Sequence, residues 1–161
     1  MRFRTRLALL VLGGVSMAGT ATAGLLDGQA PPLGDGVTST IVYRLGAVHF
    51  EPAGWVDTTV TCTNVSPEPA TVGLEIFDES DQRAGNLAKA TVAAGGAVTF
   101  ATSADAVPGA VAVAGLPPID HGKARVSAST KQITCTAMNR MRGSDGAVKE
   151  APVELVKKVA F

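Results

Sequence analysis

The sequence contains few aromatic residues, few histidines and cysteines, and no excess of basic charge. Its 161 residues include one Trp, one Tyr, five Phe, two His and two Cys. Lys and Arg together number 14, and Asp and Glu also number 14. Proteins that bind nucleic acids through phosphate contacts need a basic surface. The composition therefore argues against a nucleic-acid-binding protein.

Long apolar runs are also missing, except for one at the N-terminus. Arg2, Arg4 and Arg6 precede the uncharged apolar run 7–18, and small residues follow it as far as Ala23. This order of segments is typical of a secretory signal peptide cleaved after Ala23. The apolar run is shorter than the roughly 20 residues that span a bilayer. We therefore expect export by the general secretory route to the periplasm or the extracellular space, and no integral membrane protein.

The rest of the chain is long enough for one domain. Residues 1–23 are the predicted signal peptide. Residues 24–36 are rich in Gly and Pro and have no periodicity, which predicts a flexible leader. We expect residues 37–161 to form a single domain, because a chain of this length supports one hydrophobic core. Cleavage would remove three arginines and no acidic residue, so the mature protein is predicted to be mildly acidic.

Short segments in which apolar and polar residues alternate recur along residues 37–161. In residues 56–63, for example, Val60 and Cys62 share one phase and the threonines occupy the other. Such alternation predicts half-buried β-strands, and no segment has the pattern of an amphipathic helix. Strands are expected at residues 40–50, 56–63, 71–77, 87–92, 97–102, 110–114, 123–130, 132–137 and 153–161.

The two cysteines are predicted to pair. Cys62 and Cys135 both lie in the apolar phase of their segments. Export exposes the chain to an oxidising environment, and the sequence has no Cys-x-x-Cys motif that would indicate redox activity. We therefore expect one structural disulfide between Cys62 and Cys135 that joins two facing sheets.

Three segments resemble the immunoglobulin-like and fibronectin-like accessory modules of bacterial exported proteins. They are residues 61–67 (TCTNVSP), 72–78 (VGLEIFD) and 95–100 (GGAVTF). In those modules a strand, an Asn-containing turn and a strand ending in Phe-Asp precede a strand that begins with Gly. The resemblance implies an all-β fold, an immunoglobulin-like antiparallel β-sandwich with one inter-sheet disulfide.

Residues suited to nucleophilic catalysis are scarce. His49 and His121 are the only histidines, and no Gly-x-Ser-x-Gly motif presents a serine. Asp120 precedes His121, but neighbours on an extended strand are expected to point to opposite faces. We therefore expect no catalytic residues and no enzyme; a hydrolase of an unrecognised type is one alternative.

A second alternative is a periplasmic copper-binding protein. His49, His121, Met138 and Met141 provide the imidazole and thioether ligands that copper accepts. Blue-copper proteins, however, place a His and a Met shortly after the ligand Cys, whereas the two methionines follow Cys135 without a His. Our primary expectation is therefore that the protein uses no metal and no cofactor.

Two further segments are interpreted as turns. Residues 78–81 (DESD) are acidic but lack the pattern of a helical calcium loop, which favours a hairpin turn. Residues 64–66 (NVS) match a glycosylation sequon, but Pro67 follows them, and we interpret them as a turn as well.

The lack of a catalytic set in an exported β-domain favours a non-catalytic role. Loops on a rigid scaffold commonly carry binding residues. We therefore predict a secreted β-sandwich module that binds an unidentified protein or cell-envelope partner, or that stabilises an envelope assembly.

Overall fold

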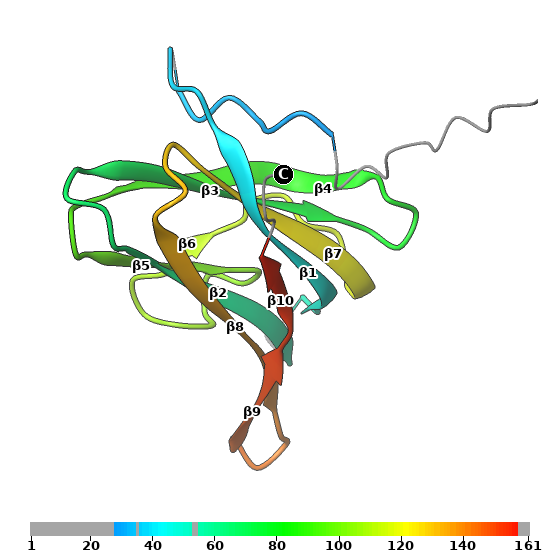
Figure 1. Ribbon diagram of the computed structural model, residues 1–161. Helices are drawn as coiled ribbons and strands as arrows, with labels where there is room; N and C mark the ends of the chain where they lie inside the picture. Colours follow the sequence, from blue (N-terminus) through cyan, green and yellow to red (C-terminus); the bar gives the residue numbers. More distant parts are fainter. Residues whose placement is uncertain (1–27, 35, 53–54, 158–161) are drawn as a thin grey trace, which may run out of the picture.

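A computed structural model describes residues 28–34, 36–52 and 55–157 of the chain (Figure 1). The described residues form ten strands and no helix, which confirms the all-β class. The predicted signal peptide, residues 1–23, lies outside the described part. The strands are β1 (Thr40–Phe50), β2 (Val56–Asn64), β3 (Ala70–Phe77), β4 (Arg83–Val92), β5 (Ala97–Ala101), β6 (Val111–Ala112), β7 (Ile119–Ala128), β8 (Ile133–Arg142), β9 (Val148–Val153) and β10 (Leu155–Lys157).

The strands form two layers that meet where β1 ends and β2 begins (Figure 1). One layer has the order β4-β3-β7-β1, and β10 also pairs with β1. The other has the order β9-β8-β2-β5, and β6 pairs with β5 in parallel. Phe50 and Asp57 form the pair that joins the layers. On the opposite side, the N–H of Asn86 donates to the carbonyl of Ala114 at 2.8 Å. The sheet is therefore almost closed into a barrel, which is compatible with an immunoglobulin-like sandwich.

The alternating pattern of each strand directs one face into a shared core. Val60 and Cys62 of β2 are buried, and so are Leu74 of β3 and Val126 of β7. Burial of such side chains contributes about 1.5–3 kcal/mol each to folding. The largest fully buried apolar side chains are Phe100, Leu45, Leu74, Ile76, Ile133, Val48, Val60, Val72 and Val126.

The segment before β1 packs against the outer face of β3. Pro31 and Leu33 are buried. A Cβ atom added to Gly73 would lie 2.5 Å from Cδ2 of Leu33. Gly73 therefore leaves a hollow that the Leu33 side chain fills. Leu33, a residue of the leader predicted over residues 24–36, is therefore packed on the sheet.

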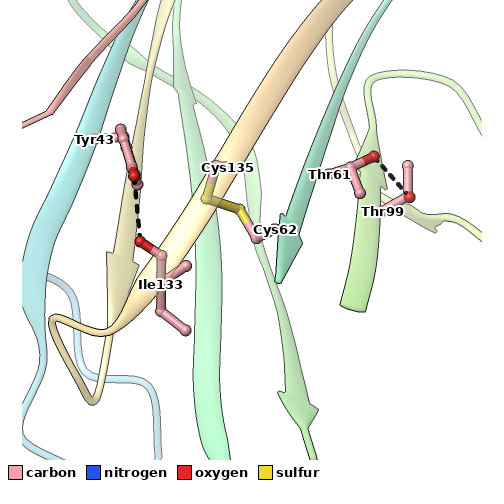
Figure 2. Close-up of a disulfide and its surroundings, with 6 residues drawn as sticks. All are labelled: Tyr43, Thr61, Cys62, Thr99, Ile133 and Cys135. Carbon is pink, nitrogen blue, oxygen red and sulfur yellow. Dashed lines mark hydrogen bonds between the residues drawn. A yellow bond between two sulfur atoms is a disulfide. The ribbon is translucent and has the colours of Figure 1, made fainter. Parts of the chain in front are cut away.

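Cys62 and Cys135 form the predicted disulfide (Figure 2). They are register partners on the adjacent antiparallel strands β2 and β8, with their Cα atoms 4.1 Å apart. This short separation is typical of a non-hydrogen-bonded antiparallel pair. The bond therefore joins neighbouring strands of one layer, and the expected placement between two facing sheets is not observed. Alternation reveals which face a residue occupies, but it does not reveal strand order.

One hydrogen bond crosses the core close to the disulfide. The hydroxyl of Tyr43 on β1 donates to the carbonyl of Ile133 on β8 at 3.2 Å (Figure 2). Both residues are buried. The bond links the two layers and satisfies a phenol that would otherwise be buried without a partner.

Asn64 organises the turn between β2 and β3. It is fully buried, and its Nδ2 donates to the carbonyls of Glu68 at 2.8 Å and Val92 at 3.1 Å. Its Oδ1 accepts hydrogen bonds from the backbone N–H of Ser66 at 3.0 Å and from the hydroxyl of the same residue at 2.6 Å. The interpretation of residues 64–66 as a turn is confirmed, because the sequon amide is engaged inside the protein.

Candidate functional site

The most irregular part of the structure is the pairing of β1 with β7 near the junction of the two layers. Val48 pairs with Gly122, and Phe50 pairs with Ile119. Two residues of β7 therefore lie opposite the single residue His49 of β1. This arrangement is a β-bulge, a feature that redirects side chains and is common beside functional sites.

The bulge brings His49, Asp120 and His121 together. Nδ1 of His121 lies 3.1 Å from Oδ2 of Asp120, and Nδ1 of His49 lies 3.7 Å from Oδ1. The centroids of the two imidazole rings are 5.5 Å apart, and the rings meet edge to face. The expectation that Asp120 and His121 point to opposite faces is therefore wrong. A bulge interrupts the alternation on which that expectation depended.

Glu79, in the turn between β3 and β4, holds the bulge in place. Its Oε1 accepts hydrogen bonds from the backbone N–H of Asp120 at 2.8 Å and of His121 at 3.0 Å. The hydrogen bond from the His121 backbone is the main cause that lowers the pKa of Glu79. No local pattern in the sequence indicates this role, because Glu79 and β7 are separated by about 40 residues.

The other carboxylates of the β3–β4 turn have different partners. Oδ1 of Asp78 accepts hydrogen bonds from the backbone N–H groups of Ser80 at 2.9 Å and Gln82 at 2.8 Å. Asp81 forms an ion pair with Lys123. The interpretation of residues 78–81 as an acidic hairpin turn is therefore confirmed, and its carboxylates do not converge as calcium ligands would.

A cleft of about 230 Å³ opens beside the histidines. One part of its lining is apolar, and the other carries three carboxylates and one imidazole. Among the described residues that line it there is no Lys, Arg, Ser, Thr or Cys. The cleft therefore favours a cationic ligand and offers no hydroxyl or thiol nucleophile. The lining residues are His49, Phe50, Glu51, Val56, Glu79, Pro118, Ile119 and Asp120.

Side chains from the other layer fix the backbone around His49. The N–H of His49 donates to Oγ1 of Thr58 at 2.8 Å, and its carbonyl accepts from Oγ1 of Thr102 at 3.1 Å. Nδ2 of Asn139 donates to the carbonyl of Ala47 at 2.9 Å. Ala47 has φ of 52°, a left-handed conformation that non-glycine residues rarely adopt. These bonds replace the regular ladder where β1 diverges from β2, and they position His49.

The predicted copper ligands are only partly brought together. The rings of His49 and His121 are neighbours, whereas Met138 and Met141 are three positions apart along β8. An odd separation along a strand places two side chains on opposite faces. The two methionines therefore do not belong to one site. Within residues 28–34, 36–52 and 55–157, no group of three or more His, Cys, Asp or Glu side chains could hold a metal ion.

Three exposed apolar residues lie at the same end of the domain, although Met141 faces away from Val148, because Val148 is the cross-strand partner of the next residue, Arg142. Trp55 is 46% exposed, Met141 56% and Val148 43%. The N–H of Arg142 donates to the carbonyl of Trp55 at 2.8 Å, and Arg142 pairs with Val148 across the β8–β9 hairpin. Met141 pairs with Val56, a residue of the cleft. The β8–β9 hairpin projects from the body of the domain (Figure 1). We refer to Trp55, Met141 and Val148 as the apolar end.

No protein-family model, no curated protein and no solved structure matches this chain. In the part of the chain that the structure describes, no helix has the length and hydrophobicity needed to cross a membrane. We therefore infer a function from the residues of this chain alone.

Proposed function

We propose that this protein is a non-catalytic exported module that binds a protein partner of the cell envelope through the apolar end. The observation that carries the proposal is the exposure of Trp55, directly before β2, and of Val148 on β9, which lie on either side of Arg142 in the backbone pairing. The exposed Met141 lies next to them on the other face of β8. Large apolar side chains that gather on a surface mark interaction sites more often than single exposed ones do.

The residue types of the apolar end fit a protein interface. Trp, Met and Arg are enriched in interfaces relative to the rest of the protein surface. Arg142 lies between Trp55 and Val148 in the backbone pairing, and Arg140 pairs with Glu150 one step further along the hairpin. Trp55 and Arg142, two residues of the enriched types, therefore lie side by side at this end of the domain.

Export and a non-catalytic role are supported by other features. The predicted signal peptide and the Cys62–Cys135 disulfide fit an oxidising compartment. The two-layer fold is compatible with the immunoglobulin-like accessory modules that the sequence resembles. The described residues that line the cleft include no hydroxyl or thiol nucleophile.

Site-specific photo-cross-linking in living cells tests the proposal. A photoreactive residue replaces Trp55 in one variant and Val65 in the other. Val65 is a matched control, because it is 60% exposed and follows β2 at the strand end opposite to Trp55. We expect one specific protein to be cross-linked from position 55 and not from position 65. The absence of a product at position 55, or the same products from both positions, would contradict the proposal.

A further inference from the structure

We propose that the cleft beside His49 is a pocket for one basic side chain, Arg or Lys, of a protein partner. The proposal rests on the proposed function for the protein that supplies this side chain, because that protein is the one that binds the apolar end. The pocket itself is testable without the partner, so the two proposals fail separately.

The cleft carries negative charge that no basic lining residue neutralises. Glu51, Glu79 and Asp120 line it, and the described lining residues include no Lys or Arg. All three carboxylate residues are exposed, so a ligand has access to them. A cleft lined by charges of one sign concentrates ligands of the opposite sign. The occupant is therefore expected to be a cation.

The remaining walls of the cleft are apolar and suit the hydrocarbon part of a basic side chain. Phe50, Val56, Pro118 and Ile119 provide these walls. Lys and Arg place their methylene groups on apolar surface while the charged end stays at a polar edge. The guanidinium of Arg also stacks on aromatic rings, and Phe50 provides one. An inorganic cation would use only the carboxylates, whereas a basic side chain uses both parts of the lining.

The size of the cleft fits one side chain. Its volume is about 230 Å³. Pockets that enclose a small-molecule ligand or a cofactor usually measure about 300–1,000 Å³. A single side chain that projects from a protein segment is therefore a better fit than a whole small-molecule ligand.

The cleft is continuous with the apolar end. Val56 in its wall is the cross-strand partner of Met141, which is 56% exposed. Cross-strand partners lie on the same face of a sheet, so Met141 extends the apolar wall outward. Trp55 directly precedes Val56 in the chain. A segment bound at the apolar end therefore has the cleft within reach of a neighbouring side chain.

The backbone around the cleft is held in place before a ligand binds. The N–H of His49 donates to Oγ1 of Thr58, and its carbonyl accepts from Oγ1 of Thr102. On the other side, Oε1 of Glu79 accepts from the N–H of Asp120. A site that is already ordered loses less entropy on binding, which favours a preformed pocket.

Nuclear magnetic resonance titration of the ¹⁵N-labelled, disulfide-oxidised protein tests the pocket. The probes are N-acetyl-arginine amide and N-acetyl-lysine amide, and the neutral control is N-acetyl-citrulline amide, which has the shape of the arginine probe. We expect both cationic probes to shift the backbone amide signals of His49 and Asp120, with a Kd of about 1–10 mM. The citrulline derivative should bind about fivefold more weakly or less, because it forms no ion pair.

Two double variants with the same change in net charge separate the cleft from the rest of the surface. Glu51→Gln/Asp120→Asn removes two carboxylates of the cleft and should weaken binding of the arginine probe by about fivefold or more. Glu68→Gln/Glu154→Gln is the matched control, because both residues are exposed and lie outside the lining. It should bind within about 1.5-fold of wild type, since distant exposed charges are screened by salt.

Four results would overturn the pocket: no shift by either cationic probe below about 100 mM, equal binding of the citrulline derivative, an equal loss in both double variants, or tighter binding of cadaverine than of both amino-acid probes. The last result would assign the cleft to a free amine. Probe binding with no protein cross-linked from position 55 would overturn the proposed function and not the pocket. A specific cross-link at position 55 without probe binding would overturn the pocket alone.

Discussion

Cys62 and Cys135 are direct partners in the register of β2 and β8, with a separation of 73 residues along the chain. All five strands from β3 to β7 lie between them in sequence. These strands belong to both layers. A bond within one layer therefore restricts the unfolded chain of nearly the whole domain, which is the main way in which a disulfide stabilises a protein in the chain-entropy description.

Reduction of the disulfide should lower the free energy of unfolding by about 4 kcal/mol, the value for a loop of this length. Urea denaturation of the oxidised and the reduced wild-type protein measures the difference without a change of sequence. Peptide mapping without reductant should recover Cys62 linked to Cys135. A difference below about 1 kcal/mol would contradict this account of the bond.

Asn64→Ala should reduce the free energy of unfolding by about 2–3 kcal/mol. The substitution removes the amide donor of the buried Val92 carbonyl and the acceptor of the buried N–H and hydroxyl of Ser66. Asn86→Ala is the matched control, because the side chain of Asn86 is exposed, and it should cost less than about 0.5 kcal/mol. Equal urea midpoints for the two variants would show that the turn does not depend on the Asn64 side chain.

Gly122→Ala should destabilise the bulge strongly, whereas Gly46→Ala should be tolerated. A Cβ atom on Gly122 would lie 2.5 Å from Cγ2 of Ile119 and 2.7 Å from the carbonyl oxygen of Phe77, and this backbone atom cannot move aside cheaply. No atom lies within 4 Å of the corresponding position at Gly46. We expect a loss of about 2–3 kcal/mol for Gly122→Ala, measured by thermal unfolding. Similar melting temperatures for both variants would contradict the close packing at β7.

Asp57→Asn should change how stability depends on pH. Burial raises the pKa of Asp57, and its opposing interactions with Arg140, Ser103 and Arg142 do not cancel this effect. The folded protein therefore binds the proton more tightly than the unfolded chain does. Wild-type stability should fall as pH rises from the unfolded-state pKa through the raised folded-state pKa.

The Asn variant has no carboxylate at this position, so it should lack this decrease and gain stability relative to wild type as pH rises. Urea denaturation of both proteins between about pH 3 and pH 7 measures this difference in stability. The acid end of the range serves as the internal control, because the wild-type carboxyl is neutral there. Parallel pH profiles for both proteins would contradict the prediction.

The strands with clear alternation were predicted well, and the end of the chain was not. Residues 153–161 were expected to form one strand, whereas β9 begins at Val148 and β10 ends at Lys157 within the described residues. Pro152 within β9 concealed the pattern. The backbone N–H of Arg142 points to β2 and away from β9. Every second residue of β8 from Arg142 back to Met138 has the same orientation, so the N–H of Met138 also points to β2. Pro152, opposite Met138, therefore removes no hydrogen bond from the β8–β9 ladder.

The candidate site was predictable only in its histidines. His49 and His121 are recognisable by residue type, but regular alternation would place the side chain of Asp120 on the opposite face from His121. A bulge depends on long-range pairing, and its local signals were only Gly46 and Gly122, one near His49 and one after His121. Glu79 had no signal, because its role is to accept backbone hydrogen bonds from a distant strand.

The most direct test of partner binding compares the two ends of β2 in one binding measurement. The protein cross-linked from position 55 is purified, and its affinity is measured for wild type, Trp55→Ala and Val65→Ala. An exposed Trp at the centre of an interface commonly contributes 2 kcal/mol or more, so Trp55→Ala should weaken binding by about tenfold or more. Val65→Ala should stay within about twofold of wild type. Equal affinities for wild type and Trp55→Ala would contradict the assignment of the apolar end as the binding surface.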